Sequence, residues 1–140
     1  MLLNREQIAA LIPHGNSMCL LDEVIRWDGE QIHCRSIHFA SVDNPLFENG
    51  KLDTILLIEY AAQAAAVHAA LSQSSLGEAR SAYIGAVKNI ELVNSIQDID
   101  IAIDIDAVCL LNNNSGAIYD VVAQQQGNIL LRGRLMLNQV

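Results

Sequence analysis

Residues 55–71 read ILLIEYAAQAAAVHAAL, and this stretch decides the fold. It is rich in alanine and leucine and free of glycine and proline, so it predicts a helix over residues 54–73. The helix is apolar on nearly every face, so we expect protein to surround it. Glu59 lies inside it, where a carboxyl group must be paired, hydrogen-bonded or protonated. Glu59 is therefore either a structural hydrogen-bonding group or a catalytic acid or base.

Length, composition and charge exclude several classes of protein. The 140 residues are enough for one domain, which we place over residues 1–140, and 51% hydrophobic against 17% charged residues excludes a disordered chain. The net charge of −8 argues against a nucleic-acid partner, because phosphate binding needs clustered Lys and Arg. Polar residues within the long helix make it a poor membrane span. Residues 1–7 lack the basic and then apolar layout of a signal peptide. We expect a cytoplasmic protein with no membrane partner.

The cysteines and histidines have no spacing typical of a metal or redox site. Cys19, Cys34 and Cys109 lie among apolar residues, where a free thiol behaves as a small hydrophobic group. We therefore expect no metal and no cofactor.

The remaining residues predict a short helix and two strands before the long helix, and four strands after it. The short helix is expected at 5–11, and the strands at 18–27, 31–39, 80–93, 98–108, 117–125 and 129–138. Residues 98–108 alternate polar and apolar side chains, so Ile99, Ile101, Ile103 and Ile105 should pack on the long helix. One apolar helix can be buried by an antiparallel sheet only if the sheet curls around it, with a second subunit covering the helix's exposed end.

Several segments, in order and spacing, are similar to the hotdog-fold β-hydroxyacyl–acyl carrier protein dehydratases. They are residues 11–14, 18–24, 44–47, 55–64, 82–85 and 97–99. The pattern is closest to the small dehydratase-like proteins of aryl-polyene and polyketide pathways, which share Pro-His-Gly, a Glu-Asn-Gly-like loop and the Ile-Glu-Tyr-Ala-Ala-Gln helix. The resemblance implies an α+β hotdog fold, an antiparallel sheet wrapped around one long central helix. It also implies a 3-hydroxyacyl-carrier dehydratase of fatty-acid or polyene synthesis.

The loop before the long helix departs from the dehydratase pattern. Residues 47–54 contain neither the histidine that acts as base in the family nor the Pro-Gly that opens the helix. The glycine whose N–H would polarise the thioester carbonyl is also unmatched. Two alternatives therefore stay open: an acyl thioesterase, and a non-catalytic hotdog subunit of a heteromeric dehydratase.

Elimination of water from a 3-hydroxyacyl thioester needs a base for the α-proton, an acid for the leaving hydroxyl and a donor for the enolate oxygen. Glu59 is our candidate acid. The free N–H groups at the helix N-terminus, near Thr54, are candidate donors. His68 follows Glu59 by nine positions, which at about 100° per residue puts it on the opposite side of the helix. His33 and His38 fall on opposite faces of one strand, and His38 is the better inward candidate.

His14 is our candidate base, in its own or the neighbouring subunit, because the other histidines fit less well and because it matches the family's Pro-His. The alternative is a histidine that only orders its loop. Gln63, one turn beyond Glu59 on the same face, is expected to orient Glu59 or a bound water. We expect Gln63, Asn49, Gly50 and Thr54 to bind the substrate, an acyl chain carried by acyl carrier protein or CoA. We expect a homodimer or a hotdog heteromer.

Overall fold

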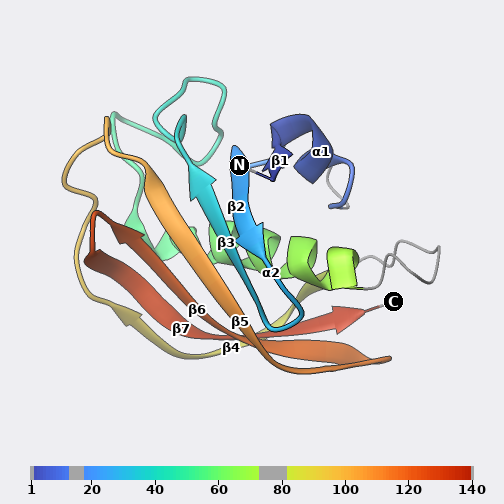
Figure 1. Ribbon diagram of the computed structural model, residues 1–140. Coiled ribbons are helices and arrows are strands. Elements are labelled where there is room, and N and C mark those ends of the chain that lie inside the picture. Colours follow the sequence, from blue (N-terminus) through green and yellow to red (C-terminus); the bar gives the residue numbers. More distant parts are fainter. Residues whose placement is uncertain (1, 13–17, 73–81, 140) are drawn as a thin grey trace.

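A curved antiparallel sheet wraps one side of a long helix in the computed structural model, which describes residues 2–12, 18–72 and 82–139 (Figure 1). The sheet has seven strands in the order β1-β2-β3-β5-β6-β7-β4. The elements are β1 (Leu3–Asn4), α1 (Arg5–Ala9), β2 (Glu23–Trp27), β3 (Gln31–Ser36), η2 (Thr54–Leu56), α2 (Leu57–Ser72), β4 (Ala82–Leu92), β5 (Ile103–Asn113), β6 (Gly116–Gln125) and β7 (Asn128–Gln139). The predicted α+β architecture is confirmed.

The long helix forms where the sequence predicts it, as the 3-10 turn η2 followed by α2. One face of α2 is buried against the sheet through Leu57, Tyr60, Ala61, Ala64, Ala65, Val67, His68 and Ala69. Small alanine side chains on this face let the helix lie close to the strands. Thr54–Ser72 is also long and apolar enough to suit a membrane span, but this packing is that of a core helix.

Within one chain, α2 is covered unevenly. The face opposite the sheet carries Ile58, Ala62 and Ala66, which are only half-buried, and Glu59, which is exposed. The reason is geometric, because one sheet can cover only one side of a helical cylinder. The described residues therefore leave an apolar stripe of the central helix partly uncovered.

The strand predicted at 98–108 begins later, at Ile103. Ile103 and Ile105 are fully buried, as expected, but Ile99 is 48% exposed and Ile101 half-buried. Residues 98–101 form a turn in which the Ile101 N–H donates to the carbonyl of Asp98. The amide of Gln125 donates to the carbonyls of both Asp98 and Ile101, at 2.8 Å each. These bonds keep the first part of the alternating segment out of the sheet.

Other helix and strand ends also differ from the predicted ones. The strands predicted at 18–27 and 31–39 are shortened to β2 and β3, and the short helix predicted at 5–11 ends at Ala9. The turn between β2 and β3 forms at residues 28–30, where the Asp28 carboxylate accepts the N–H groups of Glu30 and Gln31. Residues 18–22 precede β2 and lie outside the sheet ladder.

Candidate active site

A cleft of about 350 Å³ opens at the N-terminus of the long helix. Its lining residues are Asp53, Thr54, Ile55, Leu92, Val93, Asn94 and Ser95. The hydroxyl of Thr54 donates to the carbonyl of Asn94 at 3.2 Å, which joins the helix start to the end of β4. Asp53 occupies the N-cap position, but its side chain makes no capping hydrogen bond. Among the described residues, no side chain accepts from the first N–H groups of the helix, as an oxyanion site requires.

Glu59 lies one turn beyond Ile55 on the same face of the helix. Its side chain is exposed in the single chain, so the described part of this chain does not supply the expected burial. No described residue pairs with its carboxylate or hydrogen-bonds to it. Glu59 thus stands on the open stripe of α2, next to the cleft and with no structural partner among the described residues of its own chain.

Gln63 does not orient Glu59, which corrects the sequence-based expectation. Its Nε2 group donates to the carbonyl of Met18 at 2.6 Å, and its Oε1 accepts the N–H of Leu20 at 2.8 Å. The oxygen and the nitrogen of the amide are therefore both hydrogen-bonded to backbone groups that lie more than 40 residues earlier in the sequence. A substrate-binding role for Gln63 would require these bonds to open.

Asn49 and Gly50 form the tip of a tight turn. Glu48 and Lys51 exchange backbone hydrogen bonds of 2.9 and 3.0 Å across it, and Asn49 and Gly50 have φ angles of 55° and 75°. Two consecutive positive φ angles explain the Asn-Gly pair, which tolerates this conformation best. The turn is exposed, and its predicted role as a polar edge of the site stays a prediction.

The four histidines lie in different settings. His14 falls outside the described residues. His33 places Nδ1 2.8 Å from Asp106 and Nε2 3.5 Å from Asp104, an ion-pair cluster between β3 and β5. His38 is not in the strand, because β3 ends at Ser36, and its ring borders a second cavity.

His68 is buried in the core and holds three elements together. Its Nε2 lies 2.8 Å from the carbonyl of Asp28 and its Nδ1 2.6 Å from the hydroxyl of Tyr119. A carbonyl can only accept, so Nε2 carries the proton and Nδ1 accepts from Tyr119 in the neutral ring. The prediction that His68 is structural fits this geometry.

Burial lowers the pKa of His68, against the opposing effects of the Asp28 carbonyl and carboxylate. The folded state therefore binds the His68 proton less readily than the unfolded state, whose histidine pKa is about 6.5. Stability from neutral His68 is complete above this value and is lost as the pH falls below it. We expect the stability advantage of the wild type over His68→Gln to shrink between pH 7.5 and 5.5. Urea unfolding at both pH values tests this, and an advantage that grew on acidification would contradict it.

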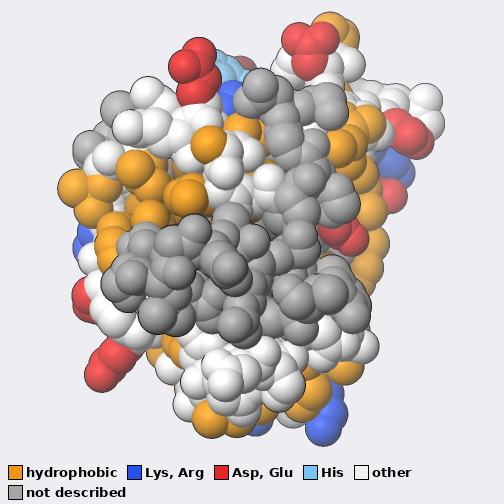
Figure 2. Space-filling model, turned by 90° about the vertical axis from the view of Figure 1, so that its right-hand side faces the viewer, with side chains coloured by type: hydrophobic (Ala, Val, Ile, Leu, Met, Phe, Trp, Pro, Cys, Tyr) orange, Lys and Arg blue, Asp and Glu red, His pale blue; other side chains and the backbone are white. Residues whose placement is uncertain are grey.

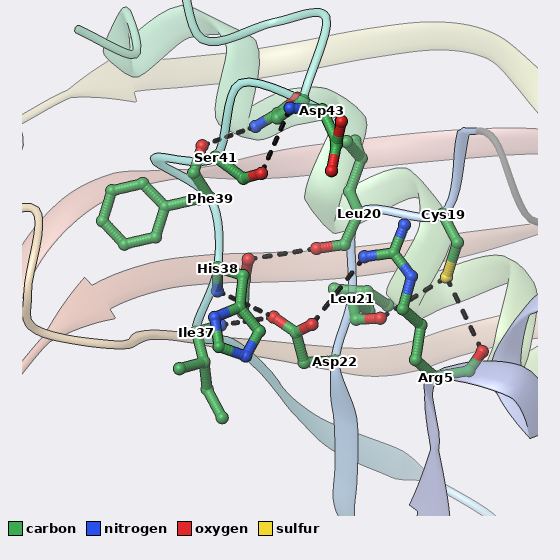
Figure 3. A network of polar contacts seen from close by, with 12 residues as sticks. Arg5, Cys19, Leu20, Leu21, Asp22, Ile37, His38, Phe39, Ser41 and Asp43 are labelled. Carbon is green, nitrogen blue, oxygen red and sulfur yellow. Dashed lines mark hydrogen bonds and ion pairs between the residues drawn. The ribbon is translucent and has the colours of Figure 1, made fainter. Parts of the chain in front are cut away.

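The second cavity, of about 430 Å³, lies between α1, residues 18–22 and the loop after β3 (Figure 3). The Asp22 carboxylate lines it, accepts the N–H groups of Ile37 and His38, and lies 3.8 Å from the Arg5 guanidinium. The other lining residues are Cys19, Leu20, Phe39, Ser41, Asp43, Asn44 and Pro45. Sequence reasoning missed this cavity because its walls come from separate segments, and the only local signal was an Asp after an apolar run.

Metal chemistry has no support in the part of the chain that is described. No group of three His, Cys, Asp or Glu side chains within residues 2–12, 18–72 and 82–139 is arranged to hold a metal ion. The thiols of Cys19 and Cys34 are free and buried, and burial raises the pKa of Cys34 to about 12. These cysteines therefore behave as small core residues.

Comparisons with known proteins agree on the fold. A family model described as ApeP-like, ApeP dehydratase, matches residues 6–140. The dehydratase heterocomplex ApeI:P from Xenorhabdus doucetiae is similar, with a TM-score of 0.83 and 22% identity over 95% of this chain and 90% of that one. A mutant of the thioesterase PA1618 from Pseudomonas aeruginosa has a TM-score of 0.70 and 12% identity over 100% and 96% of the two chains. A hypothetical thioesterase with coenzyme A from Streptococcus pneumoniae has a TM-score of 0.63 and 13% identity over 84% of each. A comparison with curated proteins found no match.

Proposed function

Because the chain belongs to the ApeP-like family of dehydratases, we propose that it removes water from a 3-hydroxyacyl thioester. The α-proton and the 3-hydroxyl leave as water, and a 2-enoyl thioester with its C–S bond intact remains.

The observation that carries this proposal is the position of Glu59 beside the cleft at the helix N-terminus. The cleft combines apolar walls from Ile55, Leu92 and Val93 with the N–H groups of the first helical turn. Apolar walls suit an acyl chain, and N–H groups at the positive end of a helix suit a thioester oxygen that gains charge in the transition state. Glu59, one turn along, is then within reach of a hydroxyl on the third carbon of a bound acyl chain.

In this arrangement Glu59 is the acid that protonates the departing hydroxyl, and His14 is the base that removes the α-proton. The backbone N–H groups near Thr54 stabilise the enolate oxygen. Asn49 and Gly50, at the exposed turn before the helix, are the proposed outer contacts of the substrate. The thioester is carried by acyl carrier protein, with CoA as the second carrier.

Thioester hydrolysis is the second candidate. It is favoured by the thioesterases among the structures of similar fold, and by the exposure of Glu59, since a solvated carboxylate can activate water. Hydrolysis would release the free carrier thiol, whereas dehydration leaves the thioester intact and lowers its mass by one water.

Mass spectrometry of the purified protein with 3-hydroxyacyl carrier substrates tests the proposal. We expect a 2-enoyl thioester. Free carrier thiol would instead identify a thioesterase. Neither product from this chain alone, with turnover restored by a second hotdog chain, would identify a subunit that is inactive without its partner.

We further propose that a second hotdog chain covers the open stripe of α2. Strand β4 is at the edge of the sheet and, among the described strands, pairs only with β7, so its other edge has unpaired backbone groups. Val87 on β4 and Leu92 and Val93 at its end are 43%, 55% and 44% exposed. Figure 2 shows the side of the molecule that lies at the right of Figure 1, on which groups of hydrophobic side chains are seen around the residues drawn in grey and basic side chains are few. An apolar strand edge beside an apolar helix face is suited to a partner of the same fold.

We expect light scattering to give the mass of a dimer at micromolar concentration. Val87→Lys should shift the protein toward a monomer, because it places a charge on the proposed interface. Val42→Lys is the matched control, since Val42 is 97% exposed in a loop and should leave the mass unchanged. A monomeric wild type would contradict self-association and leave a heteromer as the only assembly that completes the site.

A further inference from the structure

Residues 18–22 precede the paired part of β2, and hydrogen bonds from side chains hold their backbone in place. The Leu20 N–H donates to Oε1 of Gln63 at 2.8 Å, and the Leu20 carbonyl accepts the hydroxyl of Ser36 at 3.0 Å. Ser36 is fully buried. Strand pairing to β3 begins only where the Asp22 N–H donates to the carbonyl of Arg35. The backbone N–H and the backbone carbonyl of Leu20 are thus both hydrogen-bonded by side chains from other elements.

The amide of Gln63 acts like a neighbouring strand. A glutamine side chain has one acceptor and one donor group with the chemistry of a peptide unit, and here the acceptor faces Leu20 and the donor faces Met18. With both groups used, the amide joins residues 18–20 to α2 one turn beyond Glu59. Cys19 and Leu20 also form part of the wall of the cavity around Asp22 (Figure 3).

We propose that Gln63 is a positioning residue whose amide clamps the main chain of Met18 and Leu20 to the catalytic helix. The clamp fixes the distance between the segment that leads into β2 and the helical turn that carries Glu59. Its effect on turnover rests on the proposed dehydratase function, whereas its effect on the backbone does not. Misplacement of a site wall by about 1 Å can lower turnover by about 10²-fold.

The structural half of the proposal is tested by amide hydrogen exchange without substrate. In Gln63→Met the Leu20 N–H loses its acceptor, and we expect its exchange to become about ten-fold faster. The Cys109 N–H, which donates to the carbonyl of Glu30 away from this segment, is the internal reference and should not change. Gln63→Glu keeps an acceptor for Leu20 but places a carboxylate oxygen against the Met18 carbonyl, so it should loosen the segment by repulsion. Gln124→Met, on β6, is the matched control.

The catalytic half is tested by steady-state kinetics over a range of pH. For Gln63→Met we expect kcat to fall by about 10²-fold with KM and the shape of the pH profile unchanged, because no titrating group is lost. Unchanged Leu20 exchange would overturn the proposal. So would faster exchange with normal kcat, or a raised KM with normal kcat, which would make Gln63 a substrate contact. Loss of folding in both Gln63 variants would also overturn it, because Gln63 would then be a general stability residue.

The two proposals fail separately. Absence of any 2-enoyl product from the wild type would refute the proposed function, and Leu20 exchange would then decide the clamp alone. Normal wild-type turnover with no effect of Gln63→Met would refute the clamp and leave the dehydratase intact.

Discussion

Glu59→Gln is expected to lower the rate of dehydration by about 10²- to 10⁴-fold, the loss typical of a missing general acid. The amide has the shape of the carboxyl group but cannot deliver its proton to the leaving hydroxyl. No described residue of the chain depends on the Glu59 side chain for a hydrogen bond, so the variant should fold and assemble normally. The measurement is kcat by product formation, with circular dichroism and light scattering on the same sample.

Glu30→Gln is the matched control for this variant. Glu30 is an exposed glutamate in the turn between β2 and β3, and no hydrogen bond of its side chain is found among the described contacts. Its substitution should leave kcat unchanged. Retention of full activity in Glu59→Gln would remove Glu59 from the reaction and assign the acid to another residue.

His14→Ala is expected to lower kcat by a similar factor of about 10²- to 10⁴-fold, because the α-proton then has no positioned base. It should also remove the limb of the pH profile on which the free base must be deprotonated. The double variant Glu59→Gln/His14→Ala should be little slower than either single variant, since an acid and a base that act in one step are strongly non-additive.

His38→Ala distinguishes this assignment from its nearest rival. His38 borders the cavity around Asp22 and, among the described histidines, is the exposed one. We expect His38→Ala to retain most of the wild-type kcat. Loss of activity in His38→Ala with normal activity in His14→Ala would transfer the base to His38 and the reaction to that cavity.

The exposure of Glu59 would give the proposed assembly a direct role in the chemistry. In one chain the carboxylate is open to water, which suits hydrolysis as well as elimination. A second chain over the open face of α2 would exclude water from the acyl chain and from Glu59, as elimination requires. Conditions that dissociate the proposed assembly should therefore lower turnover together with the mass.

Local sequence was sufficient for the elements whose stability is local. The alanine-rich run from Ile55 to Leu71 predicted α2 to within a residue or two, because helix propensity and the absence of breakers act over short distances. Alternation predicted the inward side chains Ile103 and Ile105, because side chains on a strand alternate between faces. The order of elements and the candidate acid Glu59 followed from the same patterns and from the family resemblance.

Tertiary structure decided the features that depend on groups far apart in the sequence. The amide of Gln125 holds the turn at Asp98 and delays β5 until Ile103, and the amide of Gln63 is used by Met18 and Leu20 instead of by Glu59. Neither glutamine shows its partner in any local pattern, because a side-chain hydrogen bond is directed by the folded backbone and not by residue spacing. The exposure of Glu59 has the same origin: periodicity shows that the helix is apolar on nearly all faces, but only the curvature of the sheet decides which face it covers.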